Sequence, residues 1–155
     1  MNANSLEQLM RLVQRESLDG TKLLENPNDN PICSLSYDNT IRCVTIVWRR
    51  YATSSQYRFI HETINQMLKQ YQASKILSDD SDLPVVHAED QQWIVEYWMP
   101  RAKAAGLKTV ATNSSLSFFG RLTIGSIQVR TANEVSVKTF PNIHLARNWL
   151  RNAPE

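Results

Sequence analysis

The chain has 155 residues, of which 42% are hydrophobic and 21% are charged, and these values are typical of one soluble globular domain with a real core. Its formal net charge of +2 is too small to indicate a nucleic-acid-binding protein. The basic residues are scattered, apart from the pair at Arg49 and Arg50, so we expect no nucleic-acid partner.

No apolar run approaches the roughly 20 residues that a membrane-spanning helix needs. The first residues, MNANSLEQLMRLVQRES, carry acids and glutamines where an export signal would be apolar. We therefore expect a cytoplasmic protein without a transmembrane segment. Cys33 and Cys43 match no metal or redox spacing, and packed thiols are favoured over a disulfide between adjacent strands.

The N-terminal region predicts a helix followed by a linker. Leu6, Leu9, Met10 and Val13 recur at helical spacing, which predicts a short amphipathic helix over residues 5–15. The stretch ENPNDNP at 25–31 is rich in prolines and asparagines, which is typical of a loop. We expect residues 1–31 to form an N-terminal helix and linker, and residues 32–155 to form the main domain.

The main domain opens with a predicted β-hairpin. ICSLSY alternates apolar and polar residues, DNT reads as a turn, and IRCVTIVWRR is rich in β-branched residues. The second strand is apolar on both faces, which predicts an interior position in the sheet. A helix follows over about 55–71, with Ser54 or Ser55 as its expected cap. Its predicted buried face contains Tyr57, Ile60, Ile64, Met67, Leu68 and Tyr71.

The remaining chain alternates strands and helices. KIL predicts a short strand, and HAEDQQWIVEYWMPRAKAAG predicts a helix with a bend near residues 96–100, because Pro100 lacks an amide hydrogen. LKTVATN predicts a strand, SLSFFGRLTIGSIQVR a helix, and EVSVKTF another strand. PNIHLARNWLRN predicts a closing helix capped by Asn142.

This order predicts an α/β fold: a mixed, mostly parallel sheet of about five strands, with helices from successive βα units and an extra N-terminal helix. A doubly wound nucleotide-binding fold would show a glycine-rich turn between a strand and a helix. The chain has four glycines, and none lies in such a turn.

Three segments carry a resemblance to a known family: LPVVHAEDQQWIVEYWMPRAKAAGLKTVA, FGRLTI and VKTFPNIHLARNWL. Together they resemble the small prokaryotic STAS/SEC14-like proteins, whose fold is that of the sporulation anti-sigma factor antagonist domain (SpoIIAA-like). The resemblance covers roughly residues 32–151. It implies successive βα units and a regulatory role in which the domain docks onto partner proteins without performing chemistry.

The resemblance also implies a position for a regulatory serine. STAS domains are switched by phosphorylation of a serine at the start of the helix after the third strand. Ser81 lies in the equivalent loop here, but Asp82, Leu83 and Pro84 stand where that motif has a small Ser-Gly pair.

The stretch KILSDDSDLP, residues 75–84, contains the densest group of acids in the chain. It predicts either a solvated turn, a loop that contacts a partner or ligand, or a catalytic or metal site, and the solvated turn is favoured. A metal site would need carboxylates from more than one element, and a hydrolytic site would need a nucleophile and a base. Because the loop ends a parallel strand, it is still the best candidate location for a site.

Aromatic residues offer a second candidate. Trp93, Tyr97 and Trp98 could line an apolar ligand pocket, but their spacing favours packing against the sheet. Phe118 and Phe119 are adjacent, so one of them is expected at the surface. The expected partner- or ligand-contact residues are Asp79, Asp80, Ser81, Asp82, His87 and Phe118.

Three functions follow from these patterns. The favoured one is a non-catalytic module that binds a protein, either another protein or a second copy of this chain. The second is a carrier or sensor of a small apolar ligand, and the third is a metal-assisted enzyme that depends on the aspartates alone. We expect no enzymatic activity, no cofactor and no metal.

Overall fold

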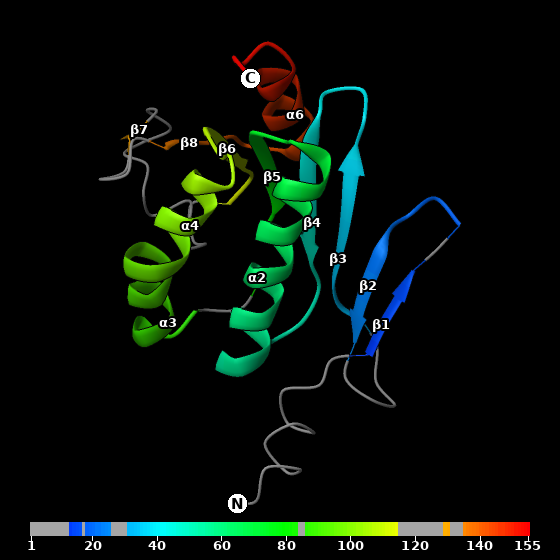
Figure 1. The fold of residues 1–155 in the computed structure, drawn as a ribbon, viewed down its shortest axis with the longest axis vertical. Helices are drawn as coiled ribbons and strands as arrows, with labels where there is room; N and C mark the ends of the chain where they lie inside the picture. The colour runs from blue at the N-terminus through cyan, green and yellow to red at the C-terminus, as the bar shows by residue number, and fades with distance from the viewer. Residues whose placement is uncertain (1–12, 17, 26–30, 84–85, 115–128, 131–134) are drawn as a thin grey trace, which may run out of the picture.

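The computed structural model describes residues 13–16, 18–25, 31–83, 86–114, 129–130 and 135–155. Within them, eight strands form one mixed sheet in the order β1-β2-β3-β4-β5-β6-β8-β7 (Figure 1). The strands are β1 (Val13–Glu16), β2 (Lys22–Glu25), β3 (Pro31–Asp38), β4 (Cys43–Trp48), β5 (Lys75–Asp79), β6 (Thr109–Thr112), β7 (Val129–Arg130) and β8 (Ser136–Thr139).

The predicted hairpin is β3 and β4, which pair antiparallel from Cys33↔Trp48 to Asp38↔Cys43. Its turn forms because the Asp38 carboxylate accepts the amide of Thr40 at 2.9 Å, as an aspartate at the start of a turn commonly does. Strand β4 also pairs with β5, so its apolar residues on both faces correctly predicted an interior strand.

The expected βα units are parallel. Strand β4 runs parallel to β5, β5 to β6, and β6 to β8. Helix α2 (Ser54–Tyr71) connects β4 to β5, and its predicted face is buried except for the half-buried Tyr71. The cap, however, is Thr53 rather than Ser54 or Ser55: the Thr53 hydroxyl accepts the Gln56 amide, and the Gln56 side chain accepts the Thr53 amide.

The helical segment between β5 and β6 has three parts: α3 (Ala88–Trp93), a π-helical turn η1 (Ile94–Trp98) and α4 (Met99–Ala104). The bend expected near residues 96–100 stays a prediction, and at this place the structure has the π turn, in which the Met99 amide donates to the carbonyl of Ile94, five residues earlier. Pro100 cannot donate to the backbone, so it is placed in the first turn of α4, where a missing amide hydrogen costs least.

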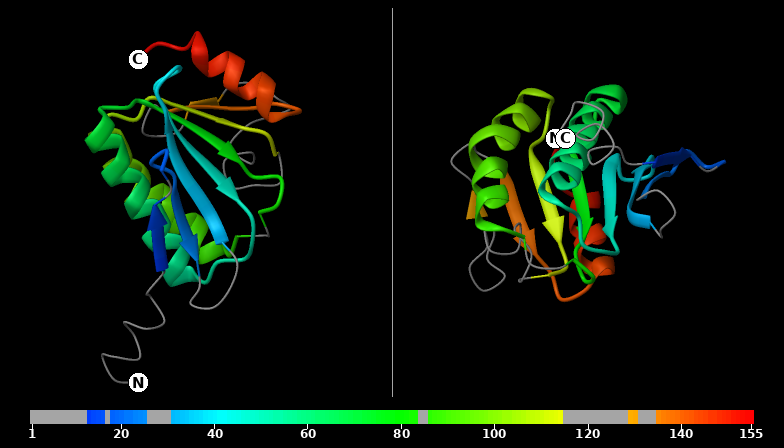
Figure 2. Two further views of the ribbon diagram at one scale, coloured as in Figure 1. Left: turned by 90° about the vertical axis from the view of Figure 1, so that its right-hand side faces the viewer. Right: turned by 90° about the horizontal axis from the view of Figure 1, so that it is seen from below.

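Helices cover both faces of the sheet. Helices α2, α3 and α4 lie on one face, and α6 (Ile143–Arg151) lies on the other (Figure 2). The larger core, with Ile60, Ile64 and Trp98, fills the space under the first group. A smaller core under α6 contains Leu77, Ala146 and Leu150. As predicted, Asn142 caps α6 by accepting the amide of Leu145 at 3.0 Å.

The N-terminal region differs from its prediction. Val13–Glu16 form strand β1, so the helix expected over residues 5–15 is wrong for its last turn, and the rest of it lies outside the described residues. Strand β2 pairs with β3, and Leu24 is fully buried in the larger core. The division at residues 31 and 32 stays a prediction, and the sheet continues across it. The helix expected over residues 115–130 is wrong at its end, because Val129–Arg130 form strand β7, and its other residues lie outside the described ones.

The two cysteines are free and buried. In the hairpin register Cys33 is opposite Trp48, whereas Cys43 is opposite Asp38, so the two lie about five residues apart along the strands. At about 3.3 Å per residue this separation far exceeds the span of a disulfide. Burial raises the pKa of the Cys43 thiol to about 11, which makes it a packing residue rather than a nucleophile.

Candidate functional site

The loops that follow the parallel strands β4, β5 and β6 meet at one edge of the sheet, which we call the carboxyl edge. The loop after β5 is joined there to the loop after β6, because the Asn113 side chain accepts the amide of Asp80 at 2.9 Å. The same Asn113 side chain donates to the Asp79 carboxylate at 2.8 Å. α/β proteins commonly place their binding sites at such an edge.

Asp80 is buried, with only 2% of its surface exposed, so the expected solvated turn is wrong for this residue. Its carboxylate accepts the hydroxyl of Ser78 at 2.5 Å and that of Thr112 at 2.6 Å. One carboxylate oxygen is thus bound to β5 and the other to β6. The arrangement makes Asp80 a buried link between two parallel strands, because its two oxygens accept hydroxyl groups from both of them.

The other residues of the acidic loop are more exposed. Asp79 is half-buried, and Ser81 and Asp82 are exposed. The Ser81 hydroxyl donates to Asp79 at 2.7 Å. Burial tends to raise the pKa of Asp79, but hydrogen bonds from Ser81 and Asn113 outweigh it and hold that pKa below its ordinary value. Asp79 is therefore an ionised acceptor that orders the loop.

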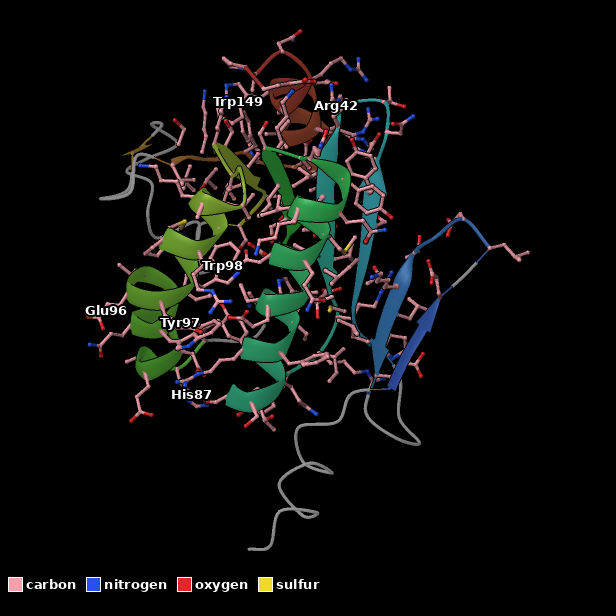
Figure 3. All side chains as sticks on the ribbon, in the orientation of Figure 1. Arg42, His87, Glu96, Tyr97, Trp98 and Trp149 are labelled. Atoms are coloured by element: carbon pink, nitrogen blue, oxygen red, sulfur yellow. The ribbon has the colours of Figure 1, made fainter. Side chains whose placement is uncertain are left out.

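A small pocket lies beside this loop, between the start of α2 and the start of α3. Its volume is about 10 Å³, the room of one water molecule. The Tyr51 hydroxyl and the His87 ring nitrogen Nε2 are 3.2 Å apart at its mouth. Figure 3 shows His87 at the lower end of α3, near the start of α2. The pocket is lined by Tyr51, Ala52, Tyr57, Leu83, Val86, His87 and Asp90.

Asp90 forms the acidic part of this pocket and is itself buried. Its carboxylate accepts the Ser54 hydroxyl at 2.7 Å and the Arg58 guanidinium at 3.2 Å, both from the first turns of α2. Arg58 also lies over the ring of Trp93, 5.4 Å from its centre. These contacts hold the start of α3 against the start of α2.

The aromatic residues behind the pocket form a packed cluster. Trp98 is fully buried and donates its indole hydrogen to the carbonyl of His61 at 2.8 Å. Tyr97 is 45% exposed and Trp93 is half-buried. Figure 3 shows Tyr97 on the side of η1 that faces α2 and Glu96 away from it. Packing is therefore confirmed for Trp98, which is in the larger core, and for Trp93, which packs against it, whereas Tyr97 is largely exposed.

Of the six site residues expected from the sequence, His87 lines the pocket, and Asp79, Asp80, Ser81 and Asp82 belong to the adjoining loop. Phe118 lies outside the described residues. Tyr51, Tyr57 and Asp90 were missed as pocket residues. Of these three, Tyr51 is the one that the sequence could have indicated, because it follows two arginines directly after a strand.

In the described part of the chain, no group of three or more His, Cys, Asp and Glu side chains is placed to hold a metal ion. Among the helices of that part, none combines the length and the apolarity that a membrane span requires. Comparisons of the chain with models of protein families, with curated proteins and with solved structures find no match.

Proposed function

We propose that the protein is a non-catalytic module that binds another protein through the carboxyl edge. The binding surface consists of the exposed side chains of Arg49, Arg50, Tyr51, Asp82 and His87, and we call it the carboxyl-edge surface. The observation that carries this proposal is the ring of Tyr51, which is 52% exposed beside two arginines. Tyrosine and arginine are the residue types that most often dominate the binding energy of protein interfaces.

The internal contacts of the aspartates favour binding over catalysis. Both oxygens of Asp80 accept hydroxyl groups within the protein, and Asp79 accepts Ser81 and Asn113. A catalytic carboxylate must reach a substrate proton or atom at hydrogen-bond distance. These carboxylates instead hold the loop in shape, which supports a role in presenting the exposed residues around them.

The size of the pocket also favours protein binding over carriage of an apolar ligand. Pockets for small molecules usually enclose at least about 300 Å³. The pocket under Tyr51 encloses about 10 Å³. A larger hollow of about 470 Å³ lies at the opposite edge of the sheet, and polar residues such as Lys69, Gln72 and Lys108 line much of it. Its apolar lining consists of small residues such as Ala73 and Ala104, with no large apolar side chain, so an apolar ligand would gain little there.

The resemblance to the STAS/SEC14-like proteins belongs to the same proposal, because regulatory STAS domains act by docking onto partners. The five central strands and their βα units are compatible with that fold. The strands β1 and β2 at one side of the sheet are additional to it. We propose a STAS-type regulatory domain whose N-terminal hairpin extends the sheet.

Affinity capture from the source organism tests the proposal. The wild-type protein is compared with the double variant Tyr51→Ser, Arg49→Ser, in which both side chains are exposed. The matched control is Leu145→Ser, Arg151→Ser, which removes an exposed apolar residue and an exposed arginine from α6 on the other face of the sheet. All the altered positions are on the surface, so all three proteins should fold.

We expect one protein to be retained in fixed proportion by the wild type and by the control, and to be lost from the edge variant. Light scattering of the purified protein shows whether that partner is a second copy of this chain. Native mass spectrometry of protein from the same host is the second readout. A retained lipid-sized adduct or a stoichiometric metal, with no bound protein, would contradict the proposal.

A further inference from the structure

The small pocket lined by Tyr51 and His87 has features beyond those that a flat protein-binding surface needs. It has two aromatic side chains at its mouth, a buried tyrosine inside and a buried carboxylate in its wall. The rings of Tyr51 and His87 meet edge to face, with centres 6.2 Å apart. Such rings attract a cation to their faces, and the attraction is strongest where water is excluded.

The electrostatic environment of the pocket is negative. Burial raises the pKa of Tyr57 strongly, and the charges of Asp80 and Asp90 raise it further. Two carboxylates therefore act on one buried hydroxyl group. Arg58 pairs with Asp90, but its side chain is 41% exposed, so water weakens its compensation of that charge. Both charges that act on Tyr57 are negative, and Arg58 pairs with only one of them, which favours a cation over an anion beside this hydroxyl group.

The size of the pocket and its apolar lining favour one class of cation over others. A volume of about 10 Å³ admits a group as large as one water molecule, which is the size of a primary ammonium head and smaller than a guanidinium. The rim carries the apolar side chains of Ala52, Leu83 and Val86. These can cover the methylene stem of a long side chain while its charged end enters the pocket.

We infer that this pocket binds a primary alkylammonium group, supplied by a lysine side chain of the protein partner. That the lysine belongs to a protein partner rests on the proposed function. The preference for an ammonium group rests on the pocket alone. The lysine stem lies between the apolar rim residues. Its ammonium group contacts the ring faces and the wall formed by Asp90.

The test uses Nα-acetyl-lysine methylamide as the probe and Nα-acetyl-norleucine methylamide, which has the stem without the charge, as its control. Backbone amide resonances of the full-length protein are followed during each titration at pH 7.5. We expect saturable shifts around residues 51–57 and 86–90 with the lysine probe. The norleucine control should bind at least about tenfold more weakly, since it lacks the cation–ring attraction.

Two variants locate the binding. Tyr51→Ala removes an exposed ring and should weaken the lysine probe about tenfold, while Phe59→Ala removes another exposed ring, on α2 outside the pocket, and should leave it unchanged. Equal binding of both probes, no saturable shift with the lysine probe, or full affinity in Tyr51→Ala would each overturn the inference. If affinity capture still retains a partner in that case, the proposed function stands, and only the inference that the partner inserts a lysine into the pocket is wrong.

Discussion

The buried carboxylate of Asp80 and the exposed one of Asp82 lie two residues apart and have different roles. Asp80 accepts Ser78 and Thr112, so Asp80→Ala would leave two buried hydroxyl groups without their acceptor. We expect a loss of about 2 kcal/mol or more in the free energy of unfolding, measured by urea titration. Asp82→Ala should stay within about 0.5 kcal/mol of the wild type, as surface changes usually do. Equal effects of the two would mean that Asp80 does not link the strands.

His61 is enclosed by aromatic rings, with the centres of Tyr57 at 4.3 Å and Trp98 at 5.1 Å from its own. Its Nδ1 lies 2.8 Å from the carbonyl of Tyr57 and, since a carbonyl can only accept, donates to it. Burial lowers the pKa of His61 to about 4, although the contact with the Tyr57 carbonyl and the charge of Asp90 oppose the shift. The folded protein therefore holds this histidine neutral where the unfolded chain would protonate it.

A pH dependence of stability follows from His61. Its folded pKa lies below the unfolded value of about 6.5, so the unfolded state binds more protons as the pH falls through this range. We expect the free energy of unfolding to fall by about 2 kcal/mol between pH 7 and pH 5. His61→Gln, which cannot titrate, should lose much less over the same range, and His61→Phe gives a second non-titrating variant. A parallel loss in both variants would contradict this assignment.

At the scale of single elements, the start of α2 offers a direct comparison between neighbours. Thr53 forms the capping box with Gln56, whereas Ser55 is exposed within the first turn. Thr53→Ala should lower the free energy of unfolding by about 1 kcal/mol, because the Gln56 amide loses its acceptor. Ser55→Ala should change it by less than about 0.5 kcal/mol. The reverse order would show that the cap lies at the position favoured by the sequence.

The sequence predicted those elements whose pattern is local. The hairpin, α2, α6 and the parallel strands carry their own periodicity, their caps and their turn residues. The N-terminal strands β1 and β2 were missed because Leu6, Leu9, Met10 and Val13 recur at helical spacing, and this pattern runs into β1. The pocket was missed for a related reason. Tyr51, Tyr57 and Asp90 come from three different segments that only the fold brings together.

At the scale of the whole molecule, the sheet runs through the N-terminal region instead of stopping before β3. Leu24 on β2 is fully buried, whereas Leu18, in the turn before that strand, is fully exposed. Leu24→Ala should lower the free energy of unfolding by about 2–5 kcal/mol, because it leaves a cavity in the main core. Leu18→Ala is the matched control and should have almost no effect. A small effect of Leu24→Ala would mean that the N-terminal region does not contribute to the main core.

Helix α6 lies on the other face of the sheet from α2 and α3, whose first residues lie beside the carboxyl-edge surface. Helix α6 covers the small core on one face and is tied to the hairpin by two hydrogen bonds from Arg147 to Asp38. The exposed Tyr51 lies between β4 and α2, beside the acidic loop. A partner that binds the carboxyl edge should therefore leave the exposed residues of α6 free.

Photochemical cross-linking tests this claim most directly. A photoreactive phenylalanine analogue replaces either Tyr51 or Leu145, which are 52% and 46% exposed, and the protein is irradiated in cells of its source organism. We predict a discrete covalent adduct with one protein from position 51 and none from position 145. An adduct from position 145 alone, or equal adducts from both positions, would contradict binding through the carboxyl edge.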